Sequence, residues 1–295
     1  MKIQLWSDAK TFNLALMKIS AFHKAKGDSV EWFDKGKQCD ILYCSKIFTA
    51  EFTADIESTE HSDAIIRGGT GYSLTDTLPF DIEHIMPDYS LYGLREAIGF
   101  LTRGCPNRCP FCIVSQKEGC ASKPVADLSE FWAGQKRITL YDPNILACRE
   151  RERLFSRLAD TDATIRFEQG LDARLIDSDS VGLLKRIKTN ELFFAWDLKK
   201  NTERVTKGLL TFKAAFPEKR ARNLKVYVLV NFDTDFKFDI HRVEWLKANG
   251  FNPYVMVYDK FSCHTKYRRL QRYANNKFVF WNTAIQDYWY LKDYL

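Results

Sequence analysis

The strongest constraint on the fold of this chain is a regular alternation of apolar and amphipathic segments between residues 97 and 260. Short apolar segments that read as β-strands recur along this region: AIGFLT, RITLY, TIRFE, LFFAW, KVYVLV and PYVMVY. Helical patterns such as residues 149–160 and 239–250 lie between most of them. Strand–helix repeats build a parallel sheet, and a complete eight-fold barrel takes about 250 residues. The shorter region here therefore predicts a partial (β/α)6 barrel of the TIM type.

The first 80 residues predict a smaller α/β unit ahead of this barrel. Residues 2–6 read as a strand, and residues 11–27 follow the period of an amphipathic helix. Gly68, Gly69 and Gly71 follow a later strand, where they would either let the backbone approach a ligand or form a simple turn. The remaining strands, expected at residues 30–33, 41–44 and 64–66, complete an open sheet of Rossmann type.

The segment between the two units has no clear period. It carries Pro79 and Pro87, which is typical of a connection. The last residues combine basic with aromatic side chains and follow the final predicted strand. The predicted organisation is a Rossmann-like domain over residues 1–80, a linker over 81–96, the barrel over 97–260 and a C-terminal extension over 261–295.

The composition of the chain predicts the cellular compartment of the protein. Hydrophobic residues make up 45% of the chain and charged residues 28%, and no apolar run approaches the ~18 residues of a membrane helix. The N-terminal residues lack the apolar core of a secretory signal. We therefore expect a cytoplasmic protein without membrane contact, in a compartment that keeps thiols reduced. The net charge of +6 allows an acidic partner without requiring one.

The most informative motif is RGCPNRCPFC, which places Cys105, Cys109 and Cys112 close together in a chain of eight cysteines. In a reducing compartment, clustered cysteines indicate metal ligands or catalytic groups. A structural zinc site normally takes four ligands, and Cys120 is the nearest candidate for a fourth. An iron–sulfur cluster held by three cysteines would instead keep one iron open for a small molecule. The spacing C-x3-C-x2-C, without the paired C-x2-C knuckles that are usual for zinc, favours the cluster over a zinc site.

This motif, at the end of the first strand of a predicted partial barrel, resembles the radical S-adenosylmethionine (SAM) superfamily. Phe111 fits the aromatic position just before the third cysteine, beside the cofactor. The resemblance implies a [4Fe–4S] cluster on Cys105, Cys109 and Cys112, with SAM chelating the open iron. It also implies reductive cleavage of SAM to methionine and a 5′-deoxyadenosyl radical, with electrons from a reductant such as flavodoxin or ferredoxin. The segments LYDPN, FEQGLDARL and FFAWD resemble barrels of members with a cobalamin-binding-like front domain.

Polar residues follow most of the predicted barrel strands, at the edge where parallel barrels place their active sites. Where many family members hold the SAM amino group with Gly-Gly-Glu, this chain offers Asp142 or Asn144. Arg174 is the candidate for the SAM carboxylate, because its fork of donors suits two oxygens. Its alternative role is a structural ion pair with Asp172 or Glu168. Three more residues would contact ribose or substrate, or else cap the following helices: Glu168, Gln169 and Asp197.

The front domain gives a weaker signal for a second cofactor. Cobalamin folds that bind cobalt through histidine resemble D-x-H-x-x-G, and the nearest stretch here runs from Asp8 to Asn13 with Lys10 in the histidine position. Some relatives bind cobalamin without that histidine, so the sequence argues against cobalamin but leaves it open. The methylthiotransferase branch wants three cysteines in this domain, and only Cys39 and Cys44 are present. Cys148 and Cys263 stand alone and read as buried or incidental thiols.

The C-terminal extension supports a second hypothesis, from a different functional class. Basic and aromatic residues alternate in KYRRLQRYANNKFVFW, a pattern that could follow a phosphate backbone and stack bases. The simpler interpretation is a helix whose Leu270 and Tyr273 side packs over the open edge of the barrel. The alternative to an enzyme is thus a non-catalytic nucleic-acid-binding protein with a structural metal site. The sequence identifies neither a substrate nor a role for any histidine.

Overall fold

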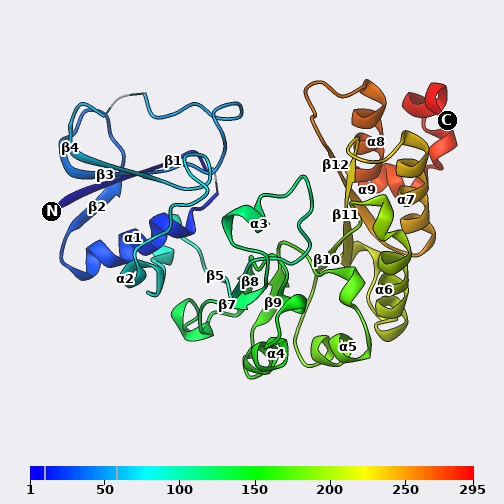
Figure 1. Cartoon of the computed structure of the whole chain (residues 1–295), viewed down its shortest axis with the longest axis horizontal. Helices are drawn as coiled ribbons and strands as arrows, with labels where there is room; N and C mark the ends of the chain where they lie inside the picture. The colour runs from blue at the N-terminus through cyan, green and yellow to red at the C-terminus, as the bar shows by residue number, and fades with distance from the viewer. Residues whose placement is uncertain (10, 58) are drawn as a thin grey trace. The chain divides into compact units, whose positions relative to one another are not determined.

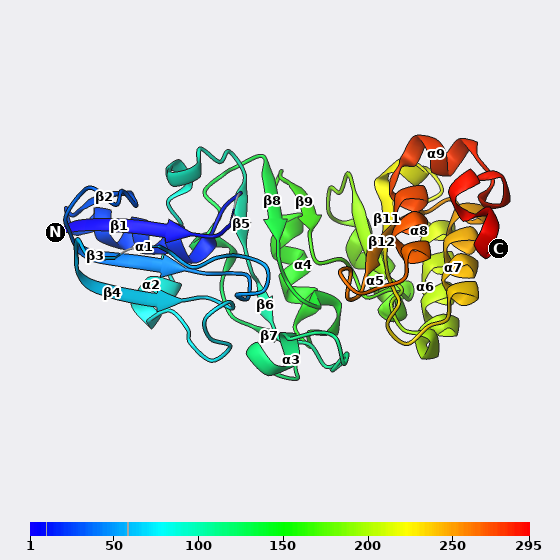
Figure 2. The same ribbon diagram turned by 90° about the horizontal axis from the view of Figure 1, so that it is seen from above.

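The structure is a computed structural model that describes residues 1–9, 11–57 and 59–295. The fold is mixed α/β and contains several parallel sheets (Figures 1 and 2). The chain divides into two compact units, Met1–Tyr141 and Asp142–Leu295. Among the described residues, no helix combines the length and the apolar character that crossing a membrane requires.

A four-stranded parallel sheet forms the core of the first unit. Its strand order is β2-β1-β3-β4, so the chain adds strands first on one side of β1 and then on the other. The carboxyl ends of β1 and β3 thus flank a point where the strand order reverses, which is where open α/β sheets bind ligands. The strands are β1 (Lys2–Ser7), β2 (Ser29–Trp32), β3 (Cys39–Ser45) and β4 (Ser62–Gly68).

Helix α1 (Leu14–Ala25) covers one face of this sheet (Figure 1). It begins after Asn13, whose side-chain oxygen accepts a hydrogen bond from the Leu16 amide at 3.2 Å, as an N-cap does. Gly27, with φ of 81°, follows the end of the helix. The buried core between helix and sheet consists of Ile3, Leu5, Leu16, Ile19 and Ile82. The strands and the helix lie where the sequence predicts them.

The rest of the first unit contains shorter elements. Helix α2 (Phe80–Glu83) and the 3-10 turn η1 (Tyr89–Tyr92) fall in or beside the predicted linker. Strand β5 pairs in parallel with β8, and β6 pairs antiparallel with β7. These elements are β5 (Ala97–Gly99), β6 (Thr102–Arg103), α3 (Val114–Lys117), β7 (Lys123–Pro124), η2 (Leu128–Glu130) and β8 (Arg137–Leu140).

The second unit is built around a three-stranded parallel sheet of order β10-β11-β12. Helices α7 and α8 lie along this sheet (Figures 1 and 2). Strand β9 meets the segment around β10 through two isolated parallel bridges, Thr164 to Lys188 and Leu171 to Phe194. The elements are η3 (Ile145–Ala147), α4 (Arg151–Ala159), β9 (Thr164–Phe167), η4 (Ala173–Leu175), α5 (Ser178–Lys185), β10 (Leu192–Ala195), η5 (Lys199–Asn201), α6 (Thr202–Ala215), η6 (Ala221–Asn223), β11 (Leu224–Val230), α7 (Phe236–Ala248), β12 (Asn252–Val257) and α8 (Thr265–Asn275).

The C-terminal extension packs on this sheet. Helix α8 contacts β12, and its Leu270 and Tyr273 side chains are buried, as the simpler interpretation of this segment predicts. Gln271 donates a hydrogen bond to the Val255 carbonyl at 3.0 Å, which ties the helix to the edge strand. Much of the extension is therefore part of the core of the second unit. It continues as α9 (Lys277–Asn282), η7 (Ile285–Asp287) and η8 (Trp289–Tyr294).

All six segments predicted as barrel strands form strands, β5 and β8 to β12. Helices also occur where the sequence predicts them, at α4 and α7. The strands therefore agree with the prediction one by one, whereas their closure into a partial barrel stays a prediction. The same holds for the boundaries predicted for the domains.

Candidate metal centre

The three clustered cysteines lie on one loop of the first unit, between β6 and β7. The two strands close the base of this loop, because Thr102 pairs with Pro124 and Arg103 with Lys123. The loop leaves β6 through Gly104, whose φ is 86°. A Cβ at Gly104 would lie 2.2 Å from the Ala121 carbonyl oxygen. The two arms of the loop thus approach so closely that only glycine fits at this position.

Backbone hydrogen bonds fix the path of the cysteine segment. The Cys105 amide donates to the Gly119 carbonyl at 3.1 Å, and the Cys112 amide donates to the Cys109 carbonyl at 2.9 Å. Arg108, in the turn between them, has a φ of 46°. All three cysteines are half-buried. The motif is therefore a structured loop with its thiols partly accessible.

Cys120 differs from the three motif cysteines. It is exposed, and its thiol lies 3.8 Å from the Ser115 carbonyl oxygen. Within the described ranges of the chain, no group of three or more His, Cys, Asp or Glu side chains is arranged to hold a metal ion. A zinc ion draws its ligands into one tight tetrahedron, whereas cysteines around a cluster each bind a different iron and lie farther apart. The three soft thiols on this braced loop are the donor type that an iron–sulfur cluster uses, and the choice between cluster and zinc stays a prediction.

A network of charged side chains links this loop to helices α1 and α2. Arg103, the first residue of the motif, pairs with Glu118 at 3.0 Å, and the other oxygen of Glu118 accepts from the Gly104 amide at 3.3 Å. Arg103 also reaches Glu83 of α2 at 3.4 Å, and Glu83 pairs with Lys18 of α1 at 3.1 Å. This chain of ion pairs connects α1 to the first residue of the loop.

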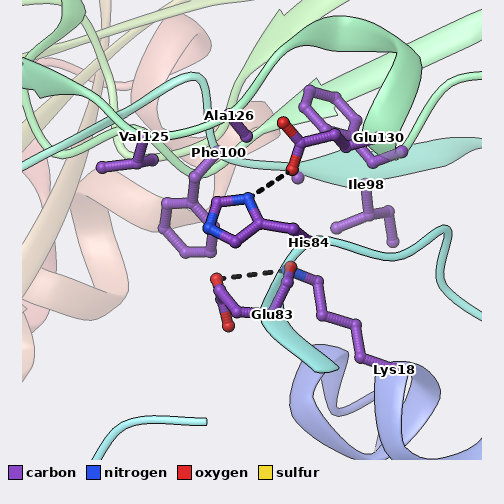
Figure 3. Close-up of a pocket in the computed structure, with 10 residues that line it drawn as sticks. Lys18, Glu83, His84, Ile98, Phe100, Val125, Ala126 and Glu130 are labelled. Atoms are coloured by element: carbon purple, nitrogen blue, oxygen red, sulfur yellow. Dashed lines mark hydrogen bonds and ion pairs between the residues drawn. The ribbon is translucent and has the colours of Figure 1, made fainter. Parts of the chain in front are cut away.

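Figure 3 shows the inner end of this network. Lys18 extends from α1 toward Glu83, and the next residue, His84, turns the other way to pair with Glu130 at 2.8 Å. Burial lowers the pKa of Lys18, and the nearby carboxylate of Glu83 opposes this effect. The cavity among these side chains has a volume of about 10 Å³, which leaves room for no more than about one water molecule. These charged side chains therefore stabilise the local fold, and the cavity among them is too small for a ligand.

In the second unit, three side chains at the carboxyl ends of successive strands form one polar group. Asn144 follows β8, and its side-chain amide donates to Asp172 at 2.9 Å. Arg174 grips the same carboxylate with two parallel bonds, Nε to Oδ1 and Nη2 to Oδ2, each 2.8 Å long. This bidentate pair is the structural alternative that the sequence left open for Arg174, with Asp172 as its partner.

Asp197 lies at the end of β10, near this group. Its carboxylate accepts from the Leu229 amide at 3.0 Å. Burial raises the pKa of Asp197 to about 6, although the Leu229 amide and the charges of Arg242 and Arg174 favour ionisation. A strand-end carboxyl group that titrates near neutral pH is a candidate for a functional role.

The other predicted strand-end residues are placed differently. Asp142 is buried, with 4% of its surface exposed, directly after β8. Gln169 is exposed, and Glu168 pairs with Arg166. Arg166 also approaches Glu191 at 3.4 Å. Glu168 thus belongs to a partly exposed ion-pair group and not to the group around Asp172.

Two sets of residues at the sites escaped the sequence analysis. The first is the brace formed by Arg103, Glu118 and Glu83. The one local signal for it is the charged residue two positions before the first cysteine. The second is the ion pair of Arg242 with Asp239, in which both side chains are fully buried. Arg242 also donates to the Leu229 carbonyl at 2.7 Å and to the Asp197 carbonyl at 3.0 Å, so it links the ends of β10 and β11. Nothing in the sequence marks this arginine as buried.

The front-domain residues considered for cobalamin have structural partners. Asp8 accepts hydrogen bonds from the amides of Ile47 and Phe48, at 2.7 and 3.0 Å. Asn13 caps α1. Lys10, at the position of the cobalt-binding histidine, lies outside the described residues. The residues that are described support the local fold, and cobalamin binding stays untested.

The remaining cysteines and glycines also have local explanations. Cys39, Cys44 and Cys148 are buried, and burial raises the pKa of Cys44 to about 11, so it is a poor source of thiolate. A Cβ at Gly69 would lie 2.4 Å from the Lys46 carbonyl oxygen, and one at Gly71 would lie 2.2 Å from that of Phe48. These glycines therefore allow the segments after β3 and β4 to touch. Cys263 is partly exposed near the start of α8.

Comparison with known proteins adds no assignment: no protein-family model matches the chain, and neither does any curated protein.

Proposed function

We propose that this protein is a radical SAM enzyme, in which Cys105, Cys109 and Cys112 hold a [4Fe–4S] cluster. The observation that carries the proposal is the motif loop itself, with three half-buried thiols on a path fixed by Gly104 and by the Arg103–Glu118 pair. The bound cluster would supply the electron that cleaves SAM to methionine and a 5′-deoxyadenosyl radical. The chain's own residues hold the thiolates, position SAM and limit the access of water.

The proposal includes the finer description of the fold. Residues 1–80 would form a Rossmann-like domain, and residues 97–260 a partial barrel whose first strand is β5. The strand order β2-β1-β3-β4 and the six strands at the predicted places support this description. In such a barrel, the loop after the first strand and the polar groups after the later strands line one edge.

The family resemblance makes several strand-end residues candidates for binding SAM. Asp142 and Asn144 follow β8 and are the candidates for its amino group. The bidentate pair with Asp172 supports a positioning role for Arg174, which holds the carboxylate that in turn holds Asn144. Asp197, with its raised pKa, is the candidate for a hydroxyl group of the ribose or of the substrate.

The outer side of the motif loop suits a transient contact with a reductant. Pro106, Arg108, Pro110 and Ile113 are exposed on it, and Arg108 gives this side a positive charge. Flavodoxins and ferredoxins are the reductants that the family resemblance implies. An electron donor with an acidic surface would be attracted to the loop that carries the thiols.

Anaerobic reconstitution tests the proposal. The full chain should take up about four irons and four sulfides, and after reduction it should form 5′-deoxyadenosine slowly from SAM without any substrate. Cys105→Ala, Cys109→Ala and Cys112→Ala should each lose the cluster. Cys120→Ala is the matched control and should keep it, because Cys120 lies outside the motif and is exposed.

Two results would contradict the proposal. Full iron retention by Cys109→Ala would show that the motif does not hold the metal. A colourless protein that binds zinc and no iron would favour the nucleic-acid-binding alternative instead.

A further inference from the structure

The first unit contains a pocket at the carboxyl ends of β1 and β3, where the strand order of the sheet reverses. We call it the switch-point pocket. Its volume is about 630 Å³, within the range of pockets that hold small organic molecules. The residues that line it come from the segments after β1 and β3, from the start of α1, and from β5 and the residues that follow β5 and β8. They include Phe12, Leu14, Ile47, Phe48, Phe100 and Tyr141.

The wall formed by the segment after β3 is held in place before any ligand arrives. Asp8 accepts from the Ile47 and Phe48 amides and from the Thr53 hydroxyl, the last at 2.7 Å. Lys46 crosses the same segment and donates to the Thr53 carbonyl at 2.9 Å. These bonds fix the backbone that presents Ile47 and Phe48 to the pocket. The site is therefore largely preformed, which reduces the entropic cost of binding.

Three polar side chains of the lining, Asp8, Asn13 and Thr53, are already hydrogen-bonded within the protein. The Asp8 carboxylate is occupied by the two amides and the Thr53 hydroxyl. The Asn13 side chain caps α1 and donates to Ser7 and Ser45, at 3.1 and 2.8 Å. No glycine lies between β1 and α1 in the sequence, although dinucleotide sites use glycines there to approach phosphate. An anionic ligand would also face the negative charge of Asp8. The pocket is thus poorly suited to nucleotides.

The surface that remains for a ligand is mainly aromatic. The Phe12 and Tyr141 rings meet edge to face at 5.6 Å, and Phe100 lies 6.2 Å from Tyr141. Phe48 completes the lining and keeps 47% of its surface exposed. Aromatic rings attract other flat rings through stacked and edge-to-face contacts. Such a lining selects for a flat, weakly polar molecule.

We propose that the switch-point pocket binds a small, uncharged molecule with a flat aromatic ring system, and that this molecule is the substrate. The second half of this statement rests on the proposed function. Phe100 precedes Cys105 by five residues, so their Cα atoms lie within about 18 Å of each other. A substrate that spans the pocket therefore lies near the loop that would hold the cluster.

Titration of the full chain with Nile red, an uncharged flat fluorophore, tests the binding. We expect saturable binding with a blue-shifted emission, both in protein as purified and after reconstitution. Phe48→Ala should weaken it about tenfold or more, since a buried phenyl contact is worth roughly one such factor. Thr11→Trp, at an exposed lining residue, should block entry. Phe278→Ala is the control: this phenyl ring of α9 is 78% exposed, and its loss should change nothing.

Three outcomes would overturn the inference. The first is an equal Nile red affinity in wild type, Phe48→Ala and Thr11→Trp. The others are displacement of the dye by ATP and displacement by stoichiometric hydroxocobalamin, the latter of which would make this a corrinoid site. The proposed function fails on different measurements, namely iron content and 5′-deoxyadenosine. Dye binding lost in both variants of a protein that takes up no iron would support the pocket and refute the enzyme. Normal iron content and 5′-deoxyadenosine formation, with dye binding unchanged in both variants, would support the enzyme and refute the pocket.

Discussion

The Cα of Gly104 faces the carbonyl oxygen of Ala121 so closely that a Cβ atom would lie 2.2 Å from that oxygen. The two residues stand on opposite arms of the cysteine loop, just inside the β6–β7 ladder. Backbone surrounds the glycine on this side, since the Glu118 carbonyl oxygen is the next nearest atom, at 3.0 Å. The contact therefore sets the width of the loop at the point where its first cysteine begins.

Replacing Gly104 should disturb metal binding more than the fold. We expect Gly104→Ala to lose most of its reconstituted iron, because the loop must open to admit a methyl group and the residue must keep a positive φ. The free energy of unfolding should fall by about 1–3 kcal/mol. Iron analysis and thermal unfolding measure the two effects. Gly182→Ala in α5 is the control, since a Cβ there meets no atom within 4 Å. Iron uptake by Gly104→Ala equal to that of wild type would refute this role for the glycine.

Replacing Asp142 and replacing Arg174, the two candidates for orienting SAM, should have different effects on the protein. Asp142→Ala should weaken SAM binding about ten- to hundredfold, the loss of one charge-assisted hydrogen bond, with iron content unchanged. Arg174→Ala should lower thermal stability as well, because it leaves the Asp172 carboxylate without its bidentate partner. Isothermal titration on the reconstituted protein gives the affinities. If SAM binds equally well to both variants, the assignment of these strand-end residues is wrong.

The sequence predicted the elements of the fold better than their contacts. The strands and α1 follow from period and composition, which are local properties, and Gly27 marks the end of α1 as expected. For Arg174 the sequence left two ion-pair partners open, Asp172 and Glu168, and the structure has Asp172. The brace from Lys18 through Glu83 to Arg103 could not be predicted in this way. It joins residues 65 and 20 positions apart, and only the packing of α1 and α2 brings them together.

The C-terminal extension shows the same limit. Its alternation of basic and aromatic residues is visible in the sequence, but which charges face the protein is not. Arg269 donates to the Tyr290 carbonyl at 3.1 Å, and Lys277 donates to the Ala274 carbonyl at 2.9 Å. Two of the cations that would contact a phosphate backbone are thus bonded to the protein itself. Fewer cations are therefore available for a nucleic acid than the sequence pattern indicates.

Asp197 should make the protein less stable as the pH rises through its titration. Its folded pKa of about 6 lies above the ordinary value of 3.8, so the folded state binds more protons between these two values. Stability therefore falls from about pH 4 to pH 6, by at most about 3 kcal/mol. Asp197→Asn should remove this slope and be at least as stable as wild type at pH 7.5. Urea unfolding at several pH values measures it. The control Asp162→Asn changes a fully exposed side chain. If Asp197→Asn keeps the wild-type dependence of stability on pH, that dependence does not come from the Asp197 carboxyl group.

Lys277 should give the opposite dependence at alkaline pH. Burial lowers its pKa from 10.5 to about 8, so the folded state releases its proton more readily than the unfolded chain does. The ionised lysine therefore costs stability below pH 8, and this cost disappears as the pH rises from about 8 to 10.5. Lys277→Met removes the charge and keeps the apolar stem, at the loss of the bonds to the Ala274 and Pro253 carbonyls. We expect it to be about 1–2 kcal/mol more stable than wild type at pH 7, with this advantage shrinking toward pH 10. Lys260→Met, at an exposed position, should show no such trend. A difference between Lys277→Met and wild type that stays constant from pH 7 to 10 would mean that the ammonium group is well solvated, and that Lys277 remains available to an acidic partner.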